Sequence, residues 1–83
     1  MPYFTYILRS ESSGRYYVGH AEDTSIRLSE HNRGCVVSTR NRGPWVLFYR
    51  EEFATRAEAA RRERYIKAMK SRKWIEELAG ASR

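Results

Sequence analysis

Several side chains of this sequence are of the types that act on phosphate esters. Tyr17 lies near the end of a strand-like run, and Arg27 and His31 follow ten and fourteen residues later. A guanidinium can grip a phosphate and stabilise the charge that develops during its cleavage, and a phenol or imidazole can accept a proton. Alone, each residue is more often structural or solvent-exposed. Together they indicate half of a phosphodiester-cleaving site, with Tyr6 and Glu63 as the other half.

Glu63 is the most informative single residue because of the residues around it. It occupies a helical stripe otherwise filled by Ala59, Ala60 and Ile66, where an unpaired carboxylate would be costly. A cation should therefore lie beside it. One interpretation is a structural ion pair with an Arg. The other is a site for one Mg²⁺ or Mn²⁺ ion, because a single carboxylate with water and phosphate oxygens is a normal Mg²⁺ shell.

The charge balance favours a polyanionic partner. Sixteen Lys and Arg against ten Asp and Glu give a net charge of +6, and each phosphate neutralised by such a chain releases a counterion. A basic loop and the basic side of the last helices should guide a nucleic-acid strand. The candidate nucleic-acid contacts are His20, Arg40, Arg42, Lys67 and Lys70.

Length and composition exclude several classes of protein. The 83 residues predict a single domain over 1–83 with a thin core and a shallow groove. The one Cys, Cys35, excludes an internal disulfide and a multi-Cys zinc site. No apolar run approaches the roughly 18 residues of a membrane span, and the N-terminus has no signal core. We therefore expect a cytoplasmic protein that does not bind membranes.

Local patterns predict the elements that position these residues. Residues 3–8 and 15–19 suit two strands joined by a turn at 11–14. If Ser10 pairs with Arg15, Tyr6 and Tyr17 lie on the same side of this hairpin. A helix capped by Asp23 or Thr24 should run to about residue 33, followed by a basic loop over 34–44.

The second half of the chain reads as one strand and two helices. Residues 45–49 form an apolar run typical of a strand covered on both faces. Thr55 and Glu58 match a capping box at the start of a long helix. That helix should restart near Ser71, and residues 79–83 should be a frayed end.

The order and spacing of these residues resemble the GIY-YIG nuclease superfamily. More narrowly, the chain is similar to small stand-alone bacterial members related to the nuclease module of the excision-repair endonuclease. The resemblance covers residues 3–78. Tyr17-Val18-Gly19 matches the second half-motif, and Phe4-Thr5-Tyr6 keeps the Tyr of the first but lacks its Gly. Arg27, Pro44-Trp45 and Glu63 match the family's later blocks.

This resemblance implies an α/β (α+β) fold with a three-stranded antiparallel sheet flanked by helices, in the order ββαβαα. It also implies metal-dependent hydrolysis of DNA, branched or damaged DNA included, by an activated water. Tyr17 would then be the general base, and Tyr6 would orient the water or the phosphate. Arg27 would stabilise the transition state, and Glu63 would hold one Mg²⁺ or Mn²⁺. His31 would contact the phosphate or assist the base.

Two departures from the family pattern leave other functions open. Some relatives have an Asn where this chain has Ile75, and the Gly before Tyr6 is missing. One alternative to the endonuclease is a catalytically silent nucleic-acid-binding module. Another is an accessory nuclease subunit that requires a protein partner.

Overall fold

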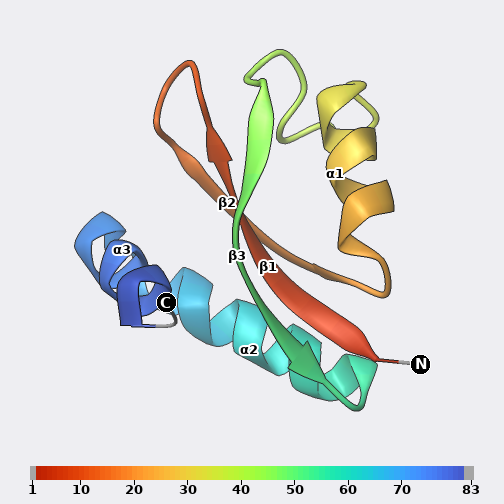
Figure 1. Ribbon diagram of the computed structural model, residues 1–83, viewed down its shortest axis with the longest axis vertical. Coiled ribbons are helices and arrows are strands. Elements are labelled where there is room, and N and C mark those ends of the chain that lie inside the picture. Colours follow the sequence, from red (N-terminus) through yellow and green to blue (C-terminus); the bar gives the residue numbers. More distant parts are fainter. Residues whose placement is uncertain (1, 82–83) are drawn as a thin grey trace.

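A three-stranded antiparallel sheet carries helices on both of its faces (Figure 1). The computed structural model describes residues 2–81. The elements are β1 (Tyr3–Ser10), β2 (Tyr16–Ala21), α1 (Thr24–Asn32), β3 (Trp45–Phe53), α2 (Arg56–Met69) and α3 (Arg72–Ala81). The strand order β2-β1-β3 makes β1 central and leaves β2 and β3 at the edges. The predicted fold class and element order are confirmed. None of the described helices has the length and apolar character needed to span a membrane.

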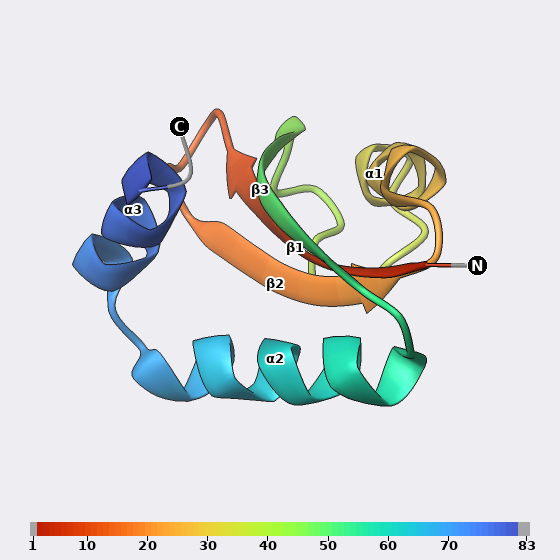
Figure 2. The same cartoon turned by 60° about the horizontal axis from the view of Figure 1, so that its bottom comes forward.

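The central strand sends alternate side chains into two separate cores. One core lies against α2 and α3 and is built around Ile7 and Ile66. The other lies on the α1 face and contains Tyr6, Leu8 and Trp45. Figure 2 shows α1 and α2 on opposite sides of the sheet. Residues of the same strand two positions apart share a face, so this alternation decides which side of the sheet each site residue reaches.

The β1–β2 hairpin has the register that the turn predicts. The Ser10 amide donates to the Arg15 carbonyl at 2.8 Å, and Tyr6 is paired with Gly19 across the strands. The rings of Tyr6 and Tyr17 lie on the same face with centroids 6.4 Å apart. β2 extends to Ala21, beyond the predicted end at residue 19.

The segment between α1 and β3 is tied to both elements. Asp23 caps α1 by accepting from the Ile26 amide at 3.0 Å. At the other end, Asn32 accepts from the Trp45 amide at 2.7 Å and donates to its carbonyl at 3.0 Å. These two bonds fix the start of β3 against the end of α1.

The prediction that the β3 segment is covered on both faces is wrong. β3 is an edge strand that pairs with β1 alone, and it continues through the charged residues to Phe53. Val46 and Leu47 keep 37% and 39% of their surface exposed. A continuous apolar run is typical of strands inside a covered sheet, but here the helices leave the start of the edge strand open.

The two C-terminal helices begin where the sequence places their caps. Thr55 and Glu58 form the predicted capping box of α2. Lys70 takes a left-handed conformation with φ of 48°, and Ser71 Oγ then accepts from the Trp74 amide at 3.1 Å to start α3. The predicted frayed end is wrong in part, because α3 continues to residue 81 and Ala79 is buried. Residues 82 and 83 lie outside the described part of the chain.

Gly19 is needed because the Tyr6 ring lies directly against its backbone. A Cβ at this position would lie 2.6 Å from Tyr6 Oη and 2.8 Å from Cζ. Contacts this short force the ring or the backbone to move. A glycine inside a strand is otherwise unfavourable, so its presence in β2 is explained by this close approach.

We predict that Gly19→Ala destabilises the fold by about 2 kcal/mol, because the buried Tyr6 ring must shift to admit the methyl group. Gly80→Ala is the matched control, since a Cβ at Gly80 meets nothing within 4 Å. Urea unfolding followed by circular dichroism measures both. Equal stability of Gly19→Ala and the wild type would show that the Tyr6–Gly19 contact does not constrain the hairpin.

Candidate active site

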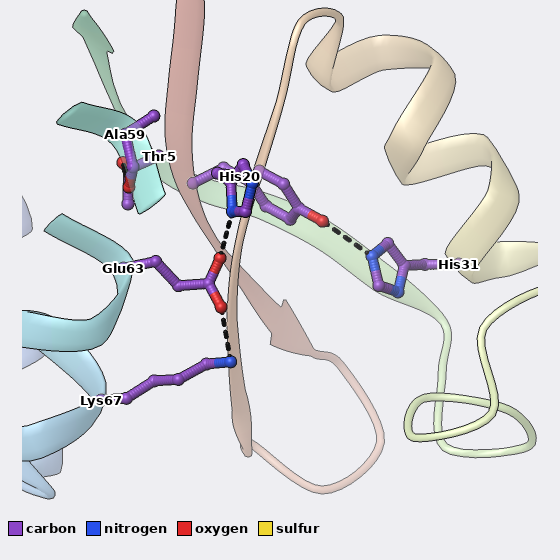
Figure 3. A network of polar contacts seen from close by, with 7 residues as sticks. Thr5, His20, His31, Ala59, Glu63 and Lys67 are labelled. Atoms are coloured by element: carbon purple, nitrogen blue, oxygen red, sulfur yellow. Dashed lines mark hydrogen bonds and ion pairs between the residues drawn. The ribbon is translucent and has the colours of Figure 1, made fainter. Parts of the chain in front are cut away.

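The predicted catalytic residues meet around the open edge of β2. Tyr6 and Tyr17 belong to the core on the α1 face, whereas Glu63 comes from α2 on the opposite face. Figure 3 shows Glu63 and His31 approaching the hairpin from opposite sides. Because β2 is an edge strand, side chains from the two faces can approach one another around it.

On the α1 face, a buried chain of hydrogen bonds fixes the Tyr6 phenol. Tyr6 Oη lies 3.0 Å from His31 Nε2, and His31 Nδ1 lies 2.7 Å from Thr39 Oγ1. The Thr39 hydroxyl donates onward to the Val36 carbonyl at 3.4 Å. With that proton committed, His31 carries its own proton on Nδ1 and accepts at Nε2 from Tyr6.

Burial keeps both Tyr6 and His31 uncharged. Burial raises the pKa of Tyr6 to about 12, against the opposing effect of the nearby Arg27 guanidinium. Burial lowers the pKa of His31 to about 4, and the positive charge of Arg27 acts in the same direction. Tyr6 is thus a neutral phenol near pH 7. His31 is fully enclosed and uses both nitrogens within the protein, so its geometry suits it to hold Tyr6.

Arg27 borders this buried chain from α1. Its Nη1 donates to Glu30 Oε1 at 3.0 Å, and this hydrogen bond raises the pKa of Arg27 above its ordinary value. The guanidinium is partly exposed, and a single carboxylate partner leaves further N–H groups for a phosphate. Arg27 is therefore accessible to an anion beside Tyr6.

On the α2 face, Glu63 is held by two donors (Figure 3). Its Oε1 lies 2.6 Å from His20 Nδ1, and its Oε2 lies 2.6 Å from Lys67 Nζ. A carboxylate can only accept, so His20 carries a proton on Nδ1. Burial alone would raise the pKa of Glu63, but Lys67 and His20 outweigh it and hold this pKa below its ordinary value. A cation lies beside Glu63 as expected, and it is a Lys rather than an Arg.

Lys67 connects the two faces of the site. Its Nζ lies 5.9 Å from the centre of the Tyr17 ring, while it also bonds to Glu63. The Tyr17 ring in turn lies 4.7 Å from the His31 ring. Tyr17 is therefore bordered by the ammonium on one side and by the Tyr6–His31 pair on the other.

The residues around Glu63 fit a metal ion held by one carboxylate. Within residues 2–81, no three His, Cys, Asp or Glu side chains are grouped as a metal site. Glu63 is 17% exposed and Lys67 is 51% exposed, so the ammonium can move away and leave Oε2 to an ion. Mg²⁺ accepts such a site because it keeps several waters and uses substrate phosphates as ligands.

The residues predicted to bind nucleic acid do not form one cluster. His20 and Lys67 contact Glu63, and Lys70 lies exposed at the end of α2. Arg40 and Arg42 lie in the loop before β3, where Arg40 Nε donates to the Gly34 carbonyl at 3.0 Å. The Arg42 side chain is exposed.

Sequence reasoning missed the supporting role of two residues. Thr39 is buried and fixes His31, and no local pattern distinguishes it from other polar residues of its loop. Lys67, a predicted nucleic-acid contact, has Glu63 as its first partner. The four-residue spacing from Glu to Lys on one helix was the available signal for this pair.

We predict that His31 makes stability sensitive to pH between its ordinary pKa of 6.5 and its pKa in the fold of about 4. The unfolded chain binds a proton in this range while the folded imidazole stays neutral, so wild-type stability falls as pH falls. His31→Gln lacks this proton uptake, and the wild type should lose about 3 kcal/mol relative to it. Urea unfolding across this range measures the difference. Parallel curves for the two proteins would show that the imidazole is not held neutral.

Comparison with known proteins identifies the family of the chain. Residues 2–75 match the GIY-YIG catalytic domain. UPF0213 proteins of Staphylococcus aureus strains Mu3 and N315 are each 41% identical over 66 residues, covering 78% of this chain and 79% of theirs. The solution NMR structure of a UPF0213 protein from Bacillus halodurans is 33% identical with a TM-score of 0.59, covering 98% of this chain and 85% of that one. The chain belongs to the GIY-YIG family of nuclease domains.

Proposed function

We propose that the protein is a metal-dependent endonuclease that hydrolyses DNA phosphodiester bonds with an activated water. The observation that carries this proposal is the meeting of Tyr17, Arg27 and Glu63 around one open strand edge. Phosphate cleavage needs a proton acceptor, a fixed positive charge and a metal ligand. These three side chains offer those functions from three different elements.

Each residue of the site has a separate task in this proposal. Arg27 binds the scissile phosphate and stabilises the charge that develops on it. Tyr17 accepts the proton of the attacking water. Tyr6, kept protonated by its burial and by His31, orients the phosphate or the water.

Glu63 is the proposed ligand for one Mg²⁺ or Mn²⁺ ion, which when bound would supply Lewis acidity toward the phosphate. His20 holds Oε1 of the carboxylate in place. Lys67 neutralises Oε2 in the absence of the ion and returns to solvent when the ion takes its place. Arg40, Arg42 and Lys70 are proposed to contact phosphates further along the DNA.

One observation favours a second candidate, a catalytically silent nucleic-acid-binding module. Both oxygens of Glu63 already have partners, Lys67 and His20, and these satisfy the carboxylate without a metal. Such a module would keep the fold and the basic surface and would bind DNA without cleaving it.

Plasmid nicking in Mg²⁺ or Mn²⁺ tests the enzyme directly. Glu63→Gln and Tyr17→Phe should each reduce the rate by about a hundredfold or more, because each removes a group needed at the reacting phosphate. Glu77→Gln and Tyr65→Phe are matched controls, since both residues are exposed and lie outside the proposed site. The controls should cleave as the wild type does.

Unchanged cleavage by Glu63→Gln and Tyr17→Phe would place the chemistry elsewhere. The binding module is supported if no form of the protein cleaves while all of them bind DNA with an affinity that falls steeply with salt.

A further inference from the structure

A recess lies between β2 and the corner where α2 meets α3. Its volume is about 450 Å³, within the roughly 300–1,000 Å³ range of small-ligand sites. Val18, Ile66 and Ile75 of the core form its apolar part. Lys70 adopts its left-handed conformation at this corner, so the chain turns there and closes one end of the recess.

The recess is strongly basic. Four cations line it, namely Arg15, Lys67, Lys70 and Arg72. None of the described residues that line it carries a carboxylate. Two carboxylates bond to lining residues, Glu63 to Lys67 and Glu76 to the Tyr16 hydroxyl. The cations therefore outnumber these adjacent carboxylates, and Arg15 and Lys70 have side chains that face solvent.

This recess is continuous with the candidate active site. Tyr17 and Lys67 line it and also belong to the site, where Lys67 bonds to Glu63. Arg72 is held in the far wall by donating to the Gly14 carbonyl at 2.8 Å and by lying 5.7 Å from the Tyr16 ring centre. A polyanion bound at Glu63 and Tyr17 would meet Lys70 and Arg15 as it continues away from the site.

A second recess, beside His31, lacks these properties. It has a volume of about 480 Å³, and Arg33 is the Lys or Arg among the described residues that line it. The Asn32 side chain in its wall is already bonded to the Trp45 backbone. Neither Tyr17 nor Glu63 lines it, so it offers no path for a strand that passes the site.

We propose that the recess between β2 and the α2–α3 corner binds the phosphodiester backbone of the nucleic-acid strand on one side of the scissile bond. This inference rests on the proposed function and deepens it. Arg15 and Lys70 supply the mobile phosphate contacts, and Arg72 supplies a fixed charge in the wall. The binding is electrostatic and tracks the backbone, so it does not depend on base sequence.

The test compares two double variants that each lose two positive charges. Arg15→Gln with Lys70→Asn changes the recess, and Asn tolerates the left-handed conformation of residue 70. Arg56→Gln with Arg61→Gln changes the first half of α2, whose residues do not line the recess. Fluorescence anisotropy with a labelled oligonucleotide, single-stranded or duplex, measures binding in EDTA, where no hydrolysis occurs. Circular dichroism verifies that both variants are folded.

The recess variant should bind roughly tenfold more weakly than the wild type, and its log–log salt slope should be shallower by about 1 to 2, because two phosphate contacts are lost. The control should lose less than about half of that slope change. A loss on single strands alone identifies an unpaired segment as the occupant, and a loss on both forms identifies the duplex backbone; either supports the proposal. Equal losses in the two variants, or none in the recess variant, would overturn it. Because EDTA binding is independent of cleavage, a nicking failure with this pattern intact would refute the endonuclease alone.

Discussion

The close approach of the Tyr6 ring to Gly19 is the constraint on which the site depends. The ring can lie across β2 because residue 19 has no side chain, since any Cβ would overlap the phenol. In that position the hydroxyl reaches His31, and α1 is thereby joined to the hairpin. The same glycine keeps the edge of β2 narrow. Side chains from the two faces of the sheet can then approach one another around it, with Tyr17 on one face and Glu63 on the other.

Charge is distributed unequally between the two sides of this edge. On the α1 side, burial keeps Tyr6 and His31 neutral, and Arg27 is the positive charge beside them. On the α2 side, the Glu63 carboxylate is ionised and balanced by Lys67. The neutral pair gives a rigid arrangement with fixed hydrogen-bond directions. The ionised pair is partly exposed and exchangeable, and this is the property that a site for an incoming cation and a phosphate requires.

The sequence predicted the elements well wherever local chemistry decides the structure. The capping box at Thr55 and the hairpin register followed from residue type and spacing. The exposure of Leu47 did not follow, because an apolar run looks the same in a central strand and in an edge strand that helices leave uncovered. In the site, the need for a cation beside Glu63 followed from its apolar neighbours. The burial of Thr39 against His31 did not, because it arises from a loop folding over a helix.

The binding of Mn²⁺ at Glu63 is the most direct test of the account, and NMR of this small protein can measure it. Paramagnetic Mn²⁺ should broaden the backbone amide signals of His20, Glu63 and their neighbours first, and Glu63→Gln should abolish this selective effect. Broadening centred instead on Glu76 and Glu77 of α3, or broadening around residue 63 that persists in Glu63→Gln, would contradict the assignment of Glu63 as the metal ligand.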